Sequence, residues 1–516
     1  MMVREGGWIL SSAQQHALDN ASVDAGTPAE VLMESAGRHA AEWIWTQRHP
    51  ASAIVLAGPG GNGGDAHVVA RKLLEAGVSV RTYCNRALEL GSPLTQRMAA
   101  RITQLGGSID ILSKGNPLLE EDIRTVDCII DGLFGSGLSR PLSGDDAAIC
   151  RLLNQSDVDT ISLDVPSGLG ADSGAVLGPT VRADATLAMA FYKPCHWFHP
   201  AADACGETHL VGVDYPEQQI ARTVPMARVP DLASVIARMP TRAVTGHKGT
   251  FGHVLVIAGS RGMTGAAILC ARGALRVGAG LVTVALPASI APVIQTAVPE
   301  ATTVLLPEVE GRWADTRLLD GLMAAMRRAD VIAIGPGLGR APDTLDVVRR
   351  ILGAATCKLV VDADAIHALV DHAELLSSMA ERVVLTPHPG EFAALVGSTA
   401  SAVDRQRFAL VAEFVSEQNI HLILKGRPTV IGVPDQSLIV NPTGNTGLAT
   451  GGSGDVLTGM MAGLIAGGSS LAGACVAGPY LHGLVADRWA EDKAERSLLP
   501  SDILETLPRI LKEMEL

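Results

Sequence analysis

Glycine-rich turns that follow short runs of β-branched residues constrain the fold of this chain most strongly. Two of these turns end in an aspartate, at 58–65 and 451–455, and the chain contains 55 glycines among its 516 residues. Glycine allows the left-handed backbone angles and close approaches that such turns need. A short strand, a tight turn and a helix form the repeating unit of parallel sheets. The pattern therefore predicts an α/β fold and disfavours an all-β or coiled-coil fold.

The predicted strands fall into two groups, which indicates two domains in a chain too long for one core. The expected strands are 53–57, 78–83, 128–131, 160–164 and 185–189, followed by 253–258, 281–285, 331–334, 359–362, 382–385 and 422–425. Between the groups, 215–245 is rich in Pro, Arg and Ala and shows no clear strand. We predict domains at 1–220 and 245–516, joined by a linker at 221–244.

Charge and cysteine content exclude several classes of protein. The formal charge of −13 and the lack of a basic stripe argue against nucleic acid as a partner. Eight cysteines without a Cys-x-x-Cys pair indicate neither a zinc knuckle nor a disulfide framework, so we expect a reducing, cytoplasmic location. Gly/Ala-rich helices favour tight packing, and we expect a homo-oligomer.

One uncharged segment, 456–486, raises the alternative of a membrane helix because it contains a Gly-x-x-x-Gly spacing at 459–463. Glycines and serines at 467–470 and Pro479 are expected to split this segment into shorter helices. We therefore predict helices buried in a large α/β domain and no membrane partner.

Asp455 ends a glycine turn that opens this apolar segment. The free N–H groups at the start of a helix bind phosphate, and a carboxylate beside them repels it. Asp455 is therefore predicted to act on the group that attacks the phosphate, as a general base. The alternative is a glycine-rich helix end followed by an Asp that caps the next helix.

In the first half, polar side chains follow one glycine loop and two strands. Asn62 and Asp65 lie in the loop, Asp131 and Asp164 end strands, and Ser167 follows closely. Strand ends converge on one crevice in open α/β sheets, and oxygen ligands of this kind suit a hard cation. The alternative is that Asp131 and Asp164 only cap turns.

Residues of about 10–215 resemble the YjeF N-terminal family, the NAD(P)H-hydrate epimerases, through the loop Gly58-Pro-Gly-Gly-Asn-Gly-Gly-Asp65. The chain departs from the family pattern at Gly61, where Asn is usual, and at Ala66, where Gly is usual. The resemblance implies a potassium ion held by Asn62, Asp131 and Ser167, and a catalytic Asp164. The substrate contacts that it implies are Gly61, Asn62, Gly63, Gly64, Asp65, Gly135, Ser136, Gly137, Leu138, Ser139, Arg140, Pro141 and Asp164.

Residues from about 245 to the end resemble the ADP/ATP-dependent NAD(P)H-hydrate dehydratases, relatives of ribokinase-like kinases. The resemblance rests on five segments in order: 247–260, 265–269, 335–339, 386–391 and 425–429, followed by the Gly451–Asp455 turn. It implies dehydratase substrate contacts at Ala266, Gly337, Gly339, His388 and Asp455, with Asp455 as the catalytic base. It implies nucleotide contacts at Lys425, Gly426, Arg427, Pro428, Thr429 and Gly454, and magnesium at Glu391. Asp362 and Asp364 receive no catalytic role.

Together the two resemblances imply a Rossmann-like three-layer sandwich followed by a ribokinase-like three-layer α/β/α domain. The implied substrates are hydrated NADH and NADPH (NADHX and NADPHX), which carry a hydroxyl at C6 of the nicotinamide ring. The implied cofactors are ADP or ATP as phosphoryl donor, Mg²⁺ and K⁺. One alternative is a small-molecule kinase fused to a ligand-binding domain. Another is a non-catalytic nucleotide sensor.

Overall fold

The computed structural model describes residues 6–112, 117–314 and 317–514. The chain divides into two compact units, one of residues 7–228 and the other consisting mainly of 229–516. The division falls inside the segment 221–244, which contains the strand β9 (Ala227–Val229) and the helix α8 (Leu232–Ile236). The expectation of no strand between the two groups is therefore wrong, because a three-residue strand leaves too short a hydrophobic pattern to recognise.

The unit 7–228 is built on a seven-stranded sheet in the order β4-β3-β2-β5-β6-β7-β8, and all its strand pairs are parallel. The strands are β2 (Ser52–Ala57), β3 (Ser79–Cys84), β4 (Ile109–Ile111), β5 (Cys128–Gly132), β6 (Asp159–Leu163), β7 (Ala185–Met189) and β8 (Glu207–Val211), with β1 (Gly7–Ile9) preceding them. The helices are α1 (Ser12–Asp24), α2 (Ala29–Arg48), α3 (Gly61–Glu75), α4 (Pro93–Gln104), α5 (Pro117–Ile123), α6 (Gly144–Leu153) and α7 (Glu217–Arg222). All five strands expected in this half are present.

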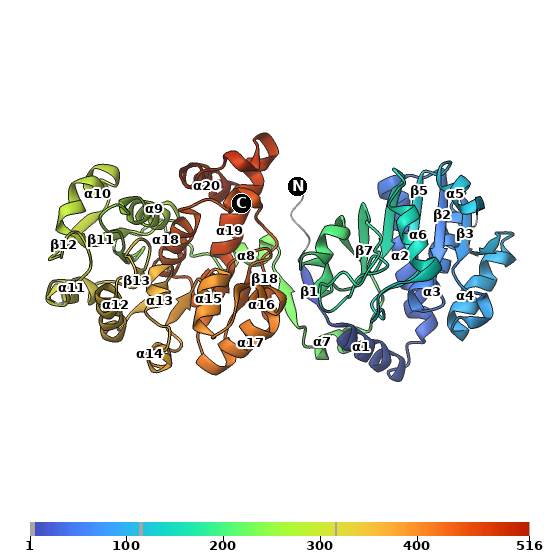
Figure 1. Ribbon diagram of the computed structural model, residues 1–516, viewed down its shortest axis with the longest axis horizontal. Helices are drawn as coiled ribbons and strands as arrows, with labels where there is room; N and C mark the ends of the chain where they lie inside the picture. Colours follow the sequence, from blue (N-terminus) through green and yellow to red (C-terminus); the bar gives the residue numbers. More distant parts are fainter. Residues whose placement is uncertain (1–5, 113–116, 315–316, 515–516) are drawn as a thin grey trace. The chain divides into compact units, whose positions relative to one another are not determined.

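Both faces of this sheet are covered, as expected for a three-layer sandwich (Figure 1). Alternate residues of β2 point to opposite faces. Val55 packs in a cluster with residues of α2 and α3, whereas Ile54 packs in a second cluster with residues of α5 and α6. The β2–α3 turn therefore lies at the carboxyl edge of the sheet, between two helical layers.

The unit 229–516 contains a larger mixed sheet, in which nine strands run in the order β18-β17-β16-β15-β14-β13-β10-β11-β12. The strands are β10 (His253–Ile257), β11 (Leu281–Pro287), β12 (Thr302–Leu306), β13 (Val331–Ile334), β14 (Lys358–Val361), β15 (Val383–Leu385), β16 (His421–Leu424), β17 (Val430–Gly432) and β18 (Leu438–Val440). Pairing is parallel from β12 to β16, and β17 and β18 are antiparallel additions. All six expected strands are present, so the predicted α/β class is confirmed for both units.

Helices of this unit cover both faces of the sheet, and α9 and α18 lie side by side (Figure 1). Their bounds are α9 (Thr264–Arg276), α10 (Ala291–Ala297), α11 (Leu318–Met326), α12 (Pro342–Ala354), α13 (Asp364–His367), α14 (Ala373–Ser378), α15 (Pro389–Leu395), α16 (Ala400–Arg405), α17 (Arg407–Gln418), α18 (Ser453–Ala466), α19 (Leu471–Asp492) and α20 (Pro500–Met514).

The uncharged segment 456–486 forms the buried helices α18 and α19. The chain breaks at 467–470 as expected, but Pro479 lies inside α19 and does not break it. Pro479 is tolerated there because α19 is held by the packing of its buried residues on every side. Across residues 6–112, 117–314 and 317–514, no helix combines the length and apolarity needed to cross a membrane.

Close contact between α18 and α9 explains the small residues of α18. A Cβ on Gly459 would lie 1.9 Å from the backbone oxygen of Cys270. We expect Gly459→Ala to lower the free energy of unfolding by about 1–3 kcal/mol, because the helices must separate. Chemical denaturation checks this, with Gly353→Ala as the matched control.

Gly353 is exposed in α12, and a Cβ there would meet only Leu375, at 3.8 Å. Gly353→Ala should therefore raise the free energy of unfolding by about 0.5–1 kcal/mol through a less flexible unfolded chain. Equal effects of the two substitutions would contradict the packing argument.

Candidate functional site

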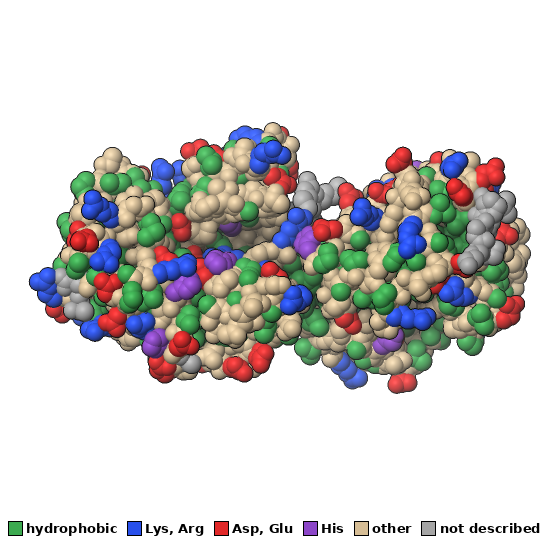
Figure 2. Space-filling model, in the orientation of Figure 1, with side chains coloured by type: hydrophobic (Ala, Val, Ile, Leu, Met, Phe, Trp, Pro, Cys, Tyr) green, Lys and Arg blue, Asp and Glu red, His purple; other side chains and the backbone are tan. Residues whose placement is uncertain are grey.

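A cleft of about 410 Å³ opens at the carboxyl ends of the parallel strands in the unit 229–516. It is lined by Gly262, Met263, Gly265, Ala266, Leu269, Gly337, Asp364, Gly451, Gly452 and Asp455. Three of the predicted substrate contacts, Ala266, Gly337 and Asp455, are thus brought together from three separate segments. Figure 2 shows that this face of the unit is hollowed and that charged and histidine side chains gather beside the hollow.

Asp455 lies in the first turn of α18 and is not its N-cap, so the capping alternative is wrong. The N-cap is Gly452, whose φ of 97° only glycine adopts readily. Burial, then the negative charge of Asp362, raises the pKa of Asp455 to about 6, while Lys425 opposes the rise. A carboxylate with this pKa is ionised at neutral pH and basic enough to accept a proton.

Lys425, directly after β16, presents its ammonium group to the same helix turn. Its Nζ donates to Asp362 Oδ1 at 2.8 Å, and a Cβ on Gly454 would lie 3.3 Å from that nitrogen. Burial by itself lowers the pKa of Lys425, but the charges of Asp362, Glu391 and Asp455 leave it raised. The ammonium group is therefore charged and lies where the α18 N–H groups would meet a phosphate.

Asp362 connects β14, the residue after β16 and α18 through the hydrogen bonds that its carboxylate accepts. It is 1% exposed and follows β14, and besides Lys425 it accepts a hydrogen bond from Thr458 Oγ1 in α18 at 2.7 Å. The neighbouring Asp364 accepts a hydrogen bond from the backbone N–H of Gly339 at 2.9 Å and pairs with Arg340 at 2.7 Å. Both strand-end aspartates therefore organise the cleft, although the sequence assigned neither a role.

His388 and Glu391 close the N-terminus of α15 as a capping box. His388 Nδ1 accepts from the backbone N–H groups of Gly390 and Glu391, and Glu391 Oε2 accepts from the backbone N–H of His388 at 2.9 Å. The His388 side chain is half exposed and the Glu391 side chain is buried. His388 Nε2 lies 3.3 Å from Glu391 Oε1, so both ring nitrogens already have partners in the first turn of α15.

Arg407 holds the predicted nucleotide loop, 425–429, through hydrogen bonds to its backbone. The Arg407 guanidinium donates to the backbone oxygens of Lys425 and Pro428, at 3.3 and 3.0 Å. A Cβ on Gly426 would collide with this guanidinium, and the φ of Gly426 is 139°. Gly426 is therefore required both by its backbone angle and by the close approach of Arg407.

In the unit 7–228, Asn62, Asp131 and Ser167 come together around the backbone of Phe134. Asn62 Nδ2 donates to the Phe134 oxygen at 3.0 Å, the Phe134 N–H donates to Ser167 Oγ at 2.9 Å, and Ser167 Oγ donates to Asp131 Oδ1 at 2.6 Å. Asn62 Oδ1 is buried and meets no hydrogen-bond donor among the described residues. A buried, unpaired oxygen beside a carboxylate is suited to a cation.

The glycine loop fits tightly around this cluster. A Cβ on Gly135 would lie 3.1 Å from the Asn62 side chain, and a Cβ on Gly63 would lie 1.8 Å from the Gly58 oxygen. By contrast, Gly61 faces open space, so the departure from the family pattern there removes a side chain without disturbing the loop. Ala66 is fully buried.

Asp164 belongs to a different group from the Asn62 cluster. Its Oδ1 lies 2.5 Å from Nζ of Lys193, a side chain with no exposed surface. Burial, then the charges of Asp164 and Asp19, raises the pKa of Asp65 well above its usual range. Asp65 and Asp164 therefore share one electrostatic environment at the sheet edge.

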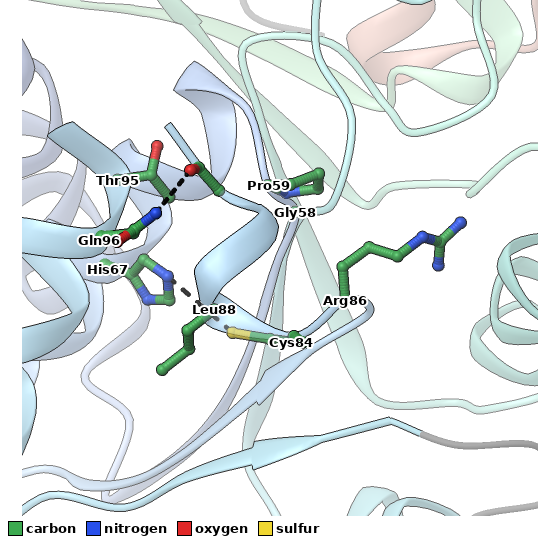
Figure 3. Close-up of a pocket in the computed structure, with 10 residues that line it drawn as sticks. Gly58, Pro59, His67, Cys84, Arg86, Leu88, Thr95 and Gln96 are labelled. Carbon is green, nitrogen blue, oxygen red and sulfur yellow. Dashed lines mark hydrogen bonds between the residues drawn. The ribbon is translucent and has the colours of Figure 1, made fainter. Parts of the chain in front are cut away.

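A small pocket of about 10 Å³ lies behind the glycine loop, bordered by Gly58, Pro59, His67, Cys84 and Arg86. Figure 3 shows the His67 ring directed at Cys84, with Nε2 and Sγ 3.9 Å apart, and the Arg86 side chain directed elsewhere. Burial lowers the pKa of His67 to about 4, so the ring is neutral. The space suits roughly one water and no cofactor.

Family models match both units. One described as NAD(P)H-hydrate dehydratase matches residues 254–509, and one described as YjeF-related protein N-terminus matches residues 29–195. A "Bifunctional NAD(P)H-hydrate repair enzyme Nnr" of Moorella thermoacetica is 36% identical over 98% of this chain and 97% of its own length. The chain belongs to this family of bifunctional NAD(P)H-hydrate repair enzymes. A second member, from Gloeobacter violaceus, is 38% identical over 89% of both chains.

Among solved structures, the chain is similar to an ADP/ATP-dependent NAD(P)H-hydrate dehydratase from Bacillus subtilis, co-crystallised with ATP/Mg²⁺. The identity is 33%, with a TM-score of 0.47, over 55% of this chain and 98% of that chain.

The sequence predicted no role for three residues that support predicted site residues of this repair enzyme: Asp362, Arg407 and Lys193. Their partners are distant, since Asp362 contacts residues 63 and 96 positions away and Lys193 contacts one 29 positions away. Burial would have been the signal, because charged side chains are rarely buried without a partner. A sequence alone does not show it.

Proposed function

We propose that this chain repairs hydrated NADH and NADPH, with epimerisation in the unit 7–228 and nucleotide-dependent dehydration in the unit 229–516. The observation that carries the proposal is the placement of Asp455 and Lys425 at the first turn of α18. Asp455 lines the cleft of about 410 Å³, and the Lys425 ammonium group lies 3.3 Å from where a Cβ on Gly454 would be. The pair places a base and a phosphate-binding cation on one helix terminus. Membership of the repair-enzyme family supplies the substrate class.

In the proposed dehydration, Asp455 removes the proton of the substrate's C6 hydroxyl while the hydroxyl oxygen attacks the terminal phosphate of ADP or ATP. The ammonium group of Lys425 neutralises charge on the transferred phosphate. Phosphate is then a better leaving group than hydroxide, and loss of phosphate from C6 together with a proton from C5 restores the double bond of the reduced nicotinamide ring. Ala266, Gly337, Gly339 and His388 would contact the S epimer.

In the proposed epimerisation, the loop 61–65, the loop 135–141 and Asp164 would contact either epimer. This step supplies S epimer from R epimer, which would account for an epimerase-type unit and a dehydratase-type unit on one chain. The proposed location is the cytoplasm, and a homo-oligomer stays a prediction.

Two cations belong to the proposal. The buried, unpaired Asn62 Oδ1 fits a K⁺ ion, which Asn62, Asp131 and Ser167 would hold and which would supply a fixed positive charge near the loop. Glu391 fits Mg²⁺ less directly, because its oxygens already serve the α15 capping box, so it would act through water. No group of three or more His, Cys, Asp and Glu side chains within the described ranges forms a metal site.

An R/S mixture of hydrated NADH tests the proposal when it is incubated with the protein, K⁺, Mg²⁺ and either ADP or ATP. Full conversion to NADH with release of free phosphate is expected. Conversion that stops at the S fraction would show that the epimerase half is inactive. A stable phosphorylated alcohol would instead identify a kinase.

The nucleotide loop offers a separate prediction. Arg407→Met removes three hydrogen bonds to the loop backbone, two at the Lys425 oxygen and one at the Pro428 oxygen. At about 1 kcal/mol each, their loss should raise the KM for nucleotide roughly tenfold or more, with a smaller effect on kcat. Asp404→Asn is the control, because Asp404 pairs with the same guanidinium but is half exposed. Steady-state kinetics with varied nucleotide would refute the prediction if both variants behaved alike.

A further inference from the structure

Lys193 is a completely buried lysine in the epimerase-type unit. It follows β7, and its Nζ lies 2.5 Å from Asp164 Oδ1 and 3.5 Å from the backbone oxygen of Phe191. Placing an ammonium group in the interior is strongly unfavourable unless an opposite charge accompanies it. Lys193 and Asp164 therefore form a buried ion pair, in which each charge offsets the cost of burying the other.

His196 forms hydrogen bonds with the backbone of both Lys193 and Asp164. The Lys193 N–H donates to His196 Nδ1 at 3.1 Å, so the neutral ring carries its proton on Nε2, which donates to the Asp164 backbone oxygen at 2.8 Å. Asp164 itself has a φ of 60°, in the left-handed region that non-glycine residues rarely adopt. Such backbone strain persists only where surrounding contacts hold it, and it is concentrated at functional sites.

Two further carboxyl groups face the pair. Asp65 comes from the second turn of α3, and Asp19 comes from α1, where it accepts a hydrogen bond from the Tyr215 hydroxyl at 2.6 Å. Burial and the neighbouring carboxylates raise the pKa of both Asp65 and Asp19, and Lys193 opposes the rise in each. One ammonium group lies among these three carboxyl groups, and it contacts Asp164 directly.

We propose that Lys193 is a positioning residue for epimerisation, whose buried ammonium group holds the Asp164 carboxylate ready to take and return the substrate hydroxyl proton. The inference rests on the proposed epimerase function. Inversion at C6, which carries the hydroxyl and the ring nitrogen, requires that one bond of this carbon break and re-form. The hydroxyl proton passes to Asp164 and from there to N1 as the C6–N1 bond breaks and the C6–O bond becomes a carbonyl, and ring closure on the other face of the carbonyl reverses both transfers. The Asp164 carboxylate, held by the Lys193 ammonium group, is the group that takes and returns this proton.

The test uses Lys193→Met in the full chain, with R-NADHX as substrate and the chain's own dehydration of S-NADHX as the internal reference. We expect the epimerase rate at pH 7 to fall by about 10²-fold or more, with the dehydration rate of pure S epimer unchanged. The acid limb of the epimerase pH profile should move to higher pH, so that part of the rate returns at alkaline pH.

Groups that face Asp164 or its neighbours are Lys193, Asp65, Asp19, His16, Tyr215 and Cys195.

A second variant separates positioning from folding. Lys193→Met combined with Asp164→Asn leaves no unpaired charge in the interior, and it should melt near the wild-type temperature and remain inactive as an epimerase at every pH. Recovery of the epimerase rate in this double variant would show that Lys193 serves folding alone, and would overturn the inference. A rate for Lys193→Met within about threefold of wild type at pH 7 would also overturn it. A wild-type chain that does not accelerate conversion of the R epimer would overturn the proposed epimerase function and this inference together.

Discussion

Asp455→Asn is expected to abolish dehydration of S-NADHX while leaving nucleotide binding nearly unchanged. Removing a well-placed general base costs about 10²–10⁴ in rate, and Asn has nearly the same shape as Asp. Rate measurements with saturating nucleotide, together with direct titration of nucleotide, check both halves of the prediction. Normal turnover by the variant would rule out Asp455 as the base.

The same substitution should stabilise the protein above pH 6. The folded-state pKa of Asp455, about 6, lies above its usual value, so the folded protein binds this proton more tightly than the unfolded chain. Stability from this group is therefore lost as the pH rises through that range, and the ionised group is unfavourable above it. Asn carries no such charge, and it should raise the free energy of unfolding at pH 8 by about 1–3 kcal/mol. At pH 4 the gain should disappear.

Asp455 also determines how the dehydration rate of the wild-type protein falls at acid pH. Dehydration requires ionised Asp455, so kcat/KM for S-NADHX should fall about tenfold per pH unit below roughly pH 6. Asp362 matters to this limb because its charge is, after burial, the largest influence that raises the pKa of Asp455.

The fold was largely predictable from the sequence because its strands are buried in parallel sheets. Such strands are continuous β-branched runs, as in β10 and β13, and glycine turns mark their ends. The missed strands lack this signal. Three of them, β4, β8 and β12, are partly exposed strands at sheet edges, and the others, β1, β9, β17 and β18, are only three residues long.

The resemblance predicts which residues contact ligand, whereas it does not predict the residues that support them. Gly451–Asp455 forms a local pattern that a sequence displays directly. Arg407 shows no pattern of its own, because its meaning depends on the backbone oxygens of a loop 18 and 21 positions away. Asp362 ends a strand as many aspartates do, and only the folded chain reveals its contacts with Lys425 and Thr458. Burial and long-range pairing therefore account for what the sequence did not show.

Asp362→Asn should lower dehydratase kcat/KM by about 10²-fold, because Lys425 loses the charge that holds its ammonium group over the first turn of α18. Part of the loss should appear as a higher KM for nucleotide. The substitution should also move the acid limb of the pH profile to lower pH, since a carboxylate that raises the pKa of Asp455 is removed.

Lys425→Met should move the same limb in the opposite direction, because the positive charge that lowers the pKa of Asp455 is lost. The charged groups that face Asp455 are Asp362, Lys425 and Asp364, so these opposite shifts test the network directly. Thr458→Val is the matched control: it removes a hydrogen bond of 2.7 Å to Asp362 but no charge, and it should leave the limb in place. Shifts of Asp362→Asn and Lys425→Met in one direction would mean that another group controls the ionisation of the base. Opposite shifts would assign Asp362 two tasks, anchoring the phosphate-binding lysine and keeping the base strong enough to take the substrate proton.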